Sequence, residues 1–136
     1  MLGRMLAALL LPLIALSVQA EETIEIKKQF GVKYVTGGVT AEEQTLLKEV
    51  APRFPVHLFF RVEGSERPIA GVKVTARDVR GDVVIQVQSE GPILMLDIPG
   101  GRYTIEAEYK GEKLSETKDL VGRRYLVLDY VFHTSS

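Results

Sequence analysis

From Val56 onward, apolar residues recur at every second position of this chain, and no other feature limits the possible folds as much. Alternation of this kind places successive side chains on opposite faces of a strand, so each run predicts a strand with one buried face. Turn-forming residues separate the runs at intervals of about eight to twelve residues, which is typical of an antiparallel sandwich. Seven strands are predicted, over residues 56–62, 72–76, 83–87, 93–97, 102–109, 112–120 and 125–132.

One helix is predicted ahead of the strands, over residues 40–51. Thr40 can cap its first turn, and Glu43, three residues later, completes a capping box. Proline lacks the N–H group that continues a helix, so the helix is expected to end before Pro52. The apolar residues that share one face of this helix are Leu46, Leu47 and Val50.

The N-terminus has the layout of a secretory signal peptide. The positive charge of Arg4 precedes an apolar run over 5–16, and Val18 and Ala20 occupy the positions where signal peptidase accepts small side chains. The run is shorter than the roughly 20 residues that cross a bilayer, which argues against an uncleaved anchor. We expect removal of residues 1–20, no membrane insertion afterwards, and a mature protein that is periplasmic or secreted.

The mature chain suits a single domain without covalent cross-links. We divide it into an N-terminal extension with the helix at 21–55, a β-sandwich at 56–132 and a tail at 133–136. Loss of Arg4 reduces the 17 basic residues to 16, against 18 acidic ones, so the net charge is −2 and no nucleic-acid partner is expected. The chain has no cysteine, so its apolar core alone must hold the fold.

The histidines of the chain, His57 and His133, carry no catalytic pattern. Nucleophilic catalysis needs a histidine base beside a nucleophile, and a zinc site needs three or four clustered ligands. His57 is opposite in phase to the core row of its strand, and His133 follows the last strand. We interpret both as surface residues and predict no enzymatic activity, no metal and no cofactor.

Three further patterns have simple structural explanations. Glu106 and Glu108 share one strand face at a spacing of about 7 Å, which could serve acid–base chemistry but is typical of a solvated face. Gly37-Gly38 before the capped helix could present backbone donors to an anion, although no phosphate fingerprint accompanies it. Arg80-Gly81-Asp82 matches an adhesive tripeptide, and turn chemistry accounts for it.

Four segments together resemble the carboxypeptidase regulatory-like domains. They are Ile69–Val74, the turn Asp78–Gly81, the element Pro99–Thr104 and the closing Val127–Tyr130. These domains are seven-stranded, transthyretin-like Greek-key sandwiches, so the resemblance implies that fold from the first predicted strand to the last. Glycines permit the turn in the third segment, and we expect Gly100 to need a positive φ there.

The same resemblance shapes the functional expectation. The segment Tyr34–Val39 and the helix after it are similar to small secreted proteobacterial proteins of unknown function that carry such a domain alone. This implies a non-enzymatic module that binds or scaffolds in the bacterial envelope, with a protein or carbohydrate ligand. The alternative is a small transthyretin-like hydrolase of the isourate type. That family depends on histidines in a central channel and a C-terminal Tyr-Arg-Gly-Ser motif, whereas this chain ends Phe132-His133-Thr134-Ser135-Ser136.

One face of the predicted sandwich is unusually apolar. In the last strand Tyr125, Val127 and Val131 alternate with the core row, and Phe59 does so in the first strand. If these strands share a sheet, the four residues form one patch, and soluble monomers seldom leave such patches in water. Two covers are possible: the helix over 40–51 as a lid, or a partner or second copy at an interface. The oligomeric state stays open. The predicted interaction patch is Phe59, Tyr125, Val127 and Val131.

Overall fold

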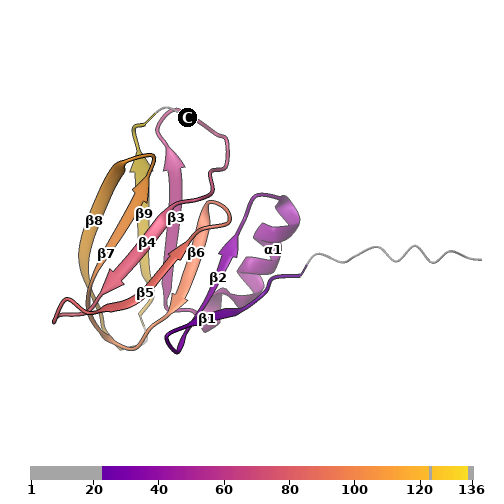
Figure 1. Ribbon diagram of the computed structural model, residues 1–136. Helices are drawn as coiled ribbons and strands as arrows, with labels where there is room; N and C mark the ends of the chain where they lie inside the picture. Colours follow the sequence, from indigo (N-terminus) through magenta and orange to yellow (C-terminus); the bar gives the residue numbers. More distant parts are fainter. Residues whose placement is uncertain (1–22, 123, 135–136) are drawn as a thin grey trace, which may run out of the picture.

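The computed structural model describes residues 23–122 and 124–134 and shows two β-sheets packed against one another, with a helix on the outer side of one sheet (Figure 1). The all-β sandwich predicted from the alternation is confirmed. The signal peptide expected over 1–20, with cleavage after Ala20, lies outside the described residues. Within the described ranges, no helix has the length and apolar character that crossing a membrane would require.

Sheet A contains five strands. The two strands at one side of it are the first and the last strand of the predicted sandwich. Neighbouring strands are antiparallel except for β3 and β9, which run parallel. Strand β9 therefore forms one edge of the sheet. The strands in spatial order are β1 (Lys27–Gln29), β2 (Val32–Gly37), β6 (Ile93–Asp97), β3 (Val56–Val62) and β9 (Leu126–Phe132).

Sheet B contains four strands and is antiparallel throughout. A turn joins its first two strands in sequence, and there the Asp78 carboxylate accepts the backbone N–H groups of Arg80 at 2.9 Å and Asp82 at 3.1 Å. Turn chemistry thus accounts for the Arg80-Gly81-Asp82 tripeptide. The strands in spatial order are β5 (Val83–Gln88), β4 (Lys73–Arg77), β7 (Gly101–Tyr109) and β8 (Glu112–Leu120).

The number of strands differs from the prediction. Seven strands, β3 to β9, lie between Val56 and Phe132, and their ends agree with the predicted ends to within one residue. The described residues contain nine strands, because the β1–β2 hairpin extends sheet A beyond β6. The prediction of seven strands is wrong by these two. Segment 21–55, which the sequence suggested to be an extension with a helix, also supplies this hairpin.

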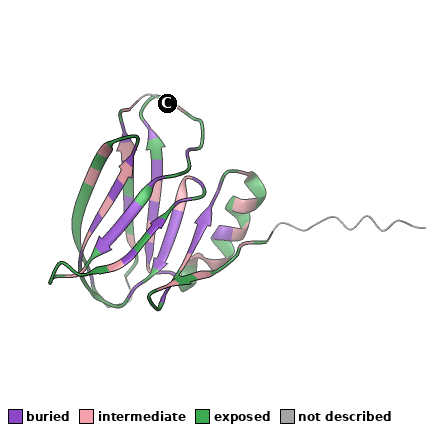
Figure 2. Ribbon diagram, in the orientation of Figure 1, coloured by how far each residue is buried: buried purple, intermediate pink, exposed green. Residues whose placement is uncertain are grey.

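The main core fills the space between the sheets. In β7 the side chains of Tyr103, Ile105, Ala107 and Tyr109 are buried, while the intervening ones point outward, as a period of two requires. The buried Tyr130 hydroxyl donates to the carbonyl of Ile105 at 2.8 Å, so its polar atom is satisfied. Burial raises the pKa of Tyr130 far above its usual value. Figure 2 shows the contrast between buried β4 and β6 and the largely exposed β8.

Helix α1 (Ala41–Val50) is held at its start by reciprocal capping bonds, and a 3-10 turn, η1 (Ala51–Arg53), follows it. The Thr40 hydroxyl accepts the N–H of Glu43 at 3.1 Å. In return the Glu43 carboxylate accepts the N–H groups of Gly38 at 3.0 Å and Val39 at 2.9 Å. This is the predicted capping box, and its acidic residue reaches back as far as Gly38.

A second, smaller apolar cluster attaches α1 to sheet A. Leu47, the buried residue of α1, packs with Val35 of β2, Met95 of β6 and Phe54. These residues lie on the face of sheet A that points away from sheet B, so the cluster is separate from the main core. The helix therefore covers β2 and β6.

Candidate interaction surface

The four residues of the predicted patch lie on the outer face of sheet A, on β3 and just before and along β9. The parallel register sets Phe59 beside Asp129 and Arg61 beside Val131. Both strands bury their alternate residues, so these side chains point away from the core. The structure thus brings together Phe59, Tyr125, Val127 and Val131, which we call the outer patch.

The outer patch is most open along β9. Tyr125 is 52% exposed and Val127 is 57% exposed, whereas Phe59 and Val131 are half-buried. The exposed carboxylate of Asp129 interrupts the row between the two valines. Tyr125, just before β9, and Val127, on β9, therefore give this side of the sheet an exposed apolar surface.

A shallow apolar groove separates the outer patch from helix α1. The helix covers β2 and β6, so the lid expected from the sequence lines the groove together with Phe59 but leaves Tyr125 and Val127 open. The groove and the outer patch are continuous because Phe59 belongs to both. The groove is lined by Gln44, Leu47, Lys48, Ala51, His57, Phe59, Ile93 and Met95.

His57 fixes the end of the helix beside this groove. Its Nε2 lies 2.7 Å from the carbonyl oxygen of Phe54 and 3.1 Å from that of Ala51. Carbonyl oxygens only accept, so Nε2 must carry the proton. The imidazole ring packs against Tyr125 with ring centroids 5.3 Å apart. The interpretation of His57 as a simple surface residue is wrong: it is half-buried and links β3 to the chain after α1.

His133 is exposed, as expected, but the chain around it is held by one carboxylate. Glu112 accepts the backbone N–H of His133 at 2.8 Å, and the backbone N–H and hydroxyl of Thr134 at 3.0 and 2.9 Å. The His133 imidazole lies 3.3 Å from a carboxylate oxygen of Glu63 and 3.3 Å from one of Glu112. These bonds, that from the His133 backbone first, lower the pKa of Glu112.

The two histidines do not form one site. His57 lies beside Val127 near the start of β9, whereas His133 follows the end of that strand. The length of β9 therefore separates them. The structure thus does not bring His57 and His133 together.

The glycine loop and the glutamate pair also have structural partners. The backbone N–H of Gly38, which could have held an anion, is bonded to Glu43, as described above. On the outer face of sheet B, Glu108 lies between Lys73 and Lys113 in the register of three strands. Cross-strand lysines are sufficient partners for a carboxylate on a solvated face.

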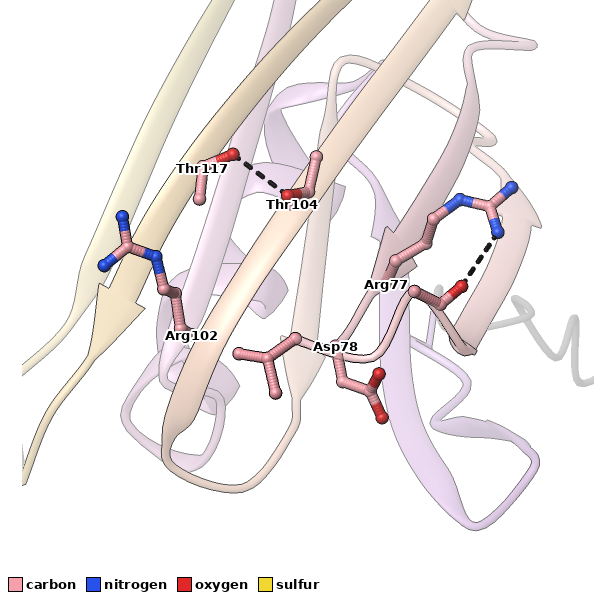
Figure 3. A pocket seen from close by; sticks show the side chains of 7 residues that line it. Arg77, Asp78, Arg102, Thr104 and Thr117 are labelled. Carbon is pink, nitrogen blue, oxygen red and sulfur yellow. Dashed lines mark hydrogen bonds between the residues drawn. The ribbon is translucent and has the colours of Figure 1, made fainter.

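A shallow polar pocket lies on the outer face of sheet B, and Figure 3 shows its two arginines pointing to opposite sides. Arg77 donates to the carbonyl of Gly81 at 3.2 Å, and Thr104 and Thr117 share a hydrogen bond of 2.9 Å. Arg102 lies 3.5 Å from the Asp119 carboxylate. The polar side chains thus have partners of their own, and the two arginines do not converge on the pocket. This pocket is therefore a weaker candidate than the outer patch.

The described part of the chain holds no cluster of three or more histidine, cysteine, aspartate or glutamate residues that could bind a metal ion. Comparison of the sequence with models of known protein families and with curated proteins finds no match. The resemblance to the carboxypeptidase regulatory-like domains thus stays a prediction, and the function must be argued from the surface itself.

Proposed function

We propose that this protein is a non-enzymatic, exported module that binds or scaffolds a protein partner in the bacterial envelope through the outer patch. One observation carries the proposal: Tyr125, just before β9, and Val127, on β9, are exposed beside an apolar groove, although a helix covers β2 and β6 on the same sheet face. Aromatic and aliphatic residues of this kind form the desolvated centres of protein interfaces.

A protein partner accounts for this surface better than a carbohydrate does. Glycan sites combine stacked aromatic rings with converging polar groups, and only Tyr125 offers an open ring on the outer patch. On the more polar face, that of sheet B, Arg77 is bonded to the Gly81 carbonyl, Arg102 lies beside the Asp119 carboxylate, and the two threonines bond each other. A carbohydrate ligand is the second candidate, and it would stack on Tyr125.

For the family, we propose a transthyretin-like Greek-key sandwich related to the carboxypeptidase regulatory-like domains. The support is the set of seven strands from Val56 to Phe132, with the order β6-β3-β9 in one sheet and β5-β4-β7-β8 in the other. A hydrolase of the isourate type is the alternative. The separation of His57 from His133 weighs against it.

The proposal is tested by cross-linking in living cells and then with purified components. A photoreactive amino acid at position 127 should capture a discrete partner, whereas the same group at position 79 should not. Val79 is a matched control, because it is an exposed valine on the turn between β4 and β5 of the other sheet. The captured protein, once purified, should bind the wild-type domain, and Tyr125→Ser should weaken that binding.

Two results would decide against the protein-partner proposal. Equal capture from positions 127 and 79 would remove the outer patch from consideration. Sedimentation of the domain with insoluble peptidoglycan, abolished by Tyr125→Ser, would instead establish the carbohydrate alternative. Tyr125→Ser should fold normally, since the hydroxyl lies 3.4 Å from the Pro52 carbonyl in a weak, exposed contact.

A further inference from the structure

Strand β9 has a free edge whose backbone polarity can be worked out from its pairing with β3. The N–H of Leu126 donates to the carbonyl of Pro55 at 2.8 Å, and the carbonyl of Phe132 accepts the N–H of Glu63 at 2.8 Å. In a parallel ladder the residues bonded to the partner alternate with residues whose backbone groups point the other way. The N–H and C=O groups of Val127, Asp129 and Val131 therefore point toward the open edge.

The other three edges of the two sheets are protected against pairing. At one end of sheet A, β1 has only three residues. In sheet B the N–H of Gln86 on edge strand β5 is already bonded to the Gln29 side chain at 2.7 Å. The remaining edge, β8, carries exposed charged side chains along its length. Short strands, occupied donors and charges are the usual means by which proteins prevent edge pairing.

In the part of the chain that the structure describes, strand β9 has no backbone partner at this edge. Strand β8 of the other sheet lies near it, and the Glu112 side chain of β8 accepts the N–H of His133 just after β9. The outward side chains of β9 near the free edge are Val127, Asp129 and Val131, so a single charge stands between two valines. Asp129 is exposed and forms no ion pair within the described residues. An added strand with a cation opposite Asp129 and apolar residues on either side would complement this row.

A second copy of the chain would complement it poorly. Antiparallel pairing of two β9 strands about their middle residue places Asp129 against Asp129, and directly opposed like charges destabilise a sheet. A shift of that symmetric register by two residues places Asp129 against a valine and leaves the carboxylate without a partner. The charge of Asp129 therefore favours a different chain.

We propose that β9 accepts an extended segment of a partner protein as an additional strand of sheet A, with alternate apolar side chains around a central lysine or arginine that pairs with Asp129. The proposal rests on the outer patch being the contact surface and specifies how the partner is held. Backbone hydrogen bonds to Val127, Asp129 and Val131 supply affinity, and the outward side-chain row supplies specificity.

The probe is a synthetic ten-residue peptide in which valines alternate with threonines around one central lysine. Two matched peptides carry either a central glutamate or N-methyl groups on the backbone nitrogens that would face β9. Amide hydrogen exchange of the full mature chain, followed by NMR, should slow at Val127, Asp129 and Val131 with the lysine peptide. The glutamate peptide should bind at least about tenfold more weakly, because like charges then face each other.

Backbone pairing and the role of the charge are separated by two further arms. The N-methylated peptide keeps every side chain but cannot donate to the edge, so its binding should be lost. In Asp129→Lys, which changes an exposed residue, the preference should reverse in favour of the glutamate peptide.

Equal affinity for the lysine and N-methylated peptides would overturn the proposal, as would protection confined to amides outside β9. The free protein could instead form a dimer that protects the same amides and that becomes stronger in Asp129→Asn. This result would assign the edge to a second copy of the chain, and the role of Asp129 would be only to oppose self-pairing. A partner captured at position 127 that leaves the β9 amides unprotected would retain the proposed function and reject strand addition.

Discussion

At the scale of single residues, Glu112 makes several hydrogen bonds through its carboxylate, and these bonds make the stability of the fold depend on pH. Its carboxylate holds the backbone of His133 and Thr134, and these bonds lower its pKa below the ordinary value of 4.5. A carboxyl group whose pKa is lower in the folded state stabilises the fold above its unfolded pKa. That stabilisation is lost as the pH falls through the folded pKa.

The first prediction concerns Glu112→Gln. The wild-type protein should lose stability progressively below about pH 5, where carboxylates protonate, and the variant should lose less over the same range. The variant should also be less stable than wild type at neutral pH, since the charged acceptor is gone. Urea unfolding between neutral and acidic pH measures both effects, with Glu66→Gln in an exposed loop as the control. Parallel curves for wild type and Glu112→Gln would contradict the role of Glu112.

The second prediction concerns Gly91. A Cβ atom there would lie 2.4 Å from the carbonyl oxygen of Gly37, which is backbone and cannot move aside easily. Gly91→Ala should therefore lower the free energy of unfolding by about 2–3 kcal/mol, as overpacking in a close-packed interior does. Gly100→Ala is the matched control, because its Cβ would meet a single backbone atom at 3.3 Å. Equal melting temperatures of the two variants would show that the loop at Gly91 relaxes.

These glycines show where turn rules stop being predictive. From the sequence we predicted a positive φ at Gly100. This prediction is wrong, because Gly100 is not among the described residues that have a positive φ. The tighter constraint is at Gly91, and it comes from Gly37, far away along the chain. Turn rules describe neighbours in sequence, so they cannot report a contact that only sheet pairing creates.

At the scale of elements, helix α1 depends on one buried side chain. Leu47 is 1% exposed and lies at the centre of the cluster beneath the helix. The capping box fixes where the helix begins, and Leu47 fixes which face it buries. The sequence predicted both, because capping and helical periodicity are local properties.

The third prediction is that Leu47→Ala lowers the free energy of unfolding by about 2–4 kcal/mol, as loss of a buried leucine side chain does. Leu46→Ala, at the half-buried neighbouring position, should cost clearly less. Chemical denaturation of both variants provides the measurement. Similar losses would mean that α1 is rotated about its axis relative to sheet A.

The hairpin of β1 and β2 is the element that the sequence did not reveal. Its two turn residues, Phe30 and Gly31, have φ values of 51° and 81°. Such turns usually carry asparagine or aspartate before the glycine, since bulky residues resist positive φ. Phenylalanine at this position therefore hid the turn, and with it the strands on either side.

At the scale of the whole molecule, the missed hairpin explains why the cover of the outer patch could not be predicted. The outward rows of β3 and β9 follow from alternation alone. The position of α1 does not, because the helix follows β2, and β2 lies on the far side of β6 from β3. Without β2, the short link from α1 to β3 made a lid over β3 and β9 the natural expectation.

The fourth prediction concerns the mature chain and rests on the sequence alone. Protein recovered from the periplasm should begin at Glu21, because small residues at Val18 and Ala20 follow a short apolar run. Intact-mass spectrometry checks this directly. Protein that retains Met1 in a membrane fraction would show that the segment is an anchor.

The parallel contact between β3 and β9 also has a consequence for how the chain reaches its fold. These strands open and close the segment from Val56 to Phe132, so their contact spans most of the chain, and contacts of high sequence separation form slowly. During synthesis or passage through a translocation channel, residues arrive in order, and β3 must wait for the last strand with one side of its backbone unpaired. We expect a chain truncated before Leu126 to collect on chaperones as an open intermediate. Pulse-labelled hydrogen exchange should show the β3 amides that face β9 gaining protection only when β9 has emerged, after those that face β6.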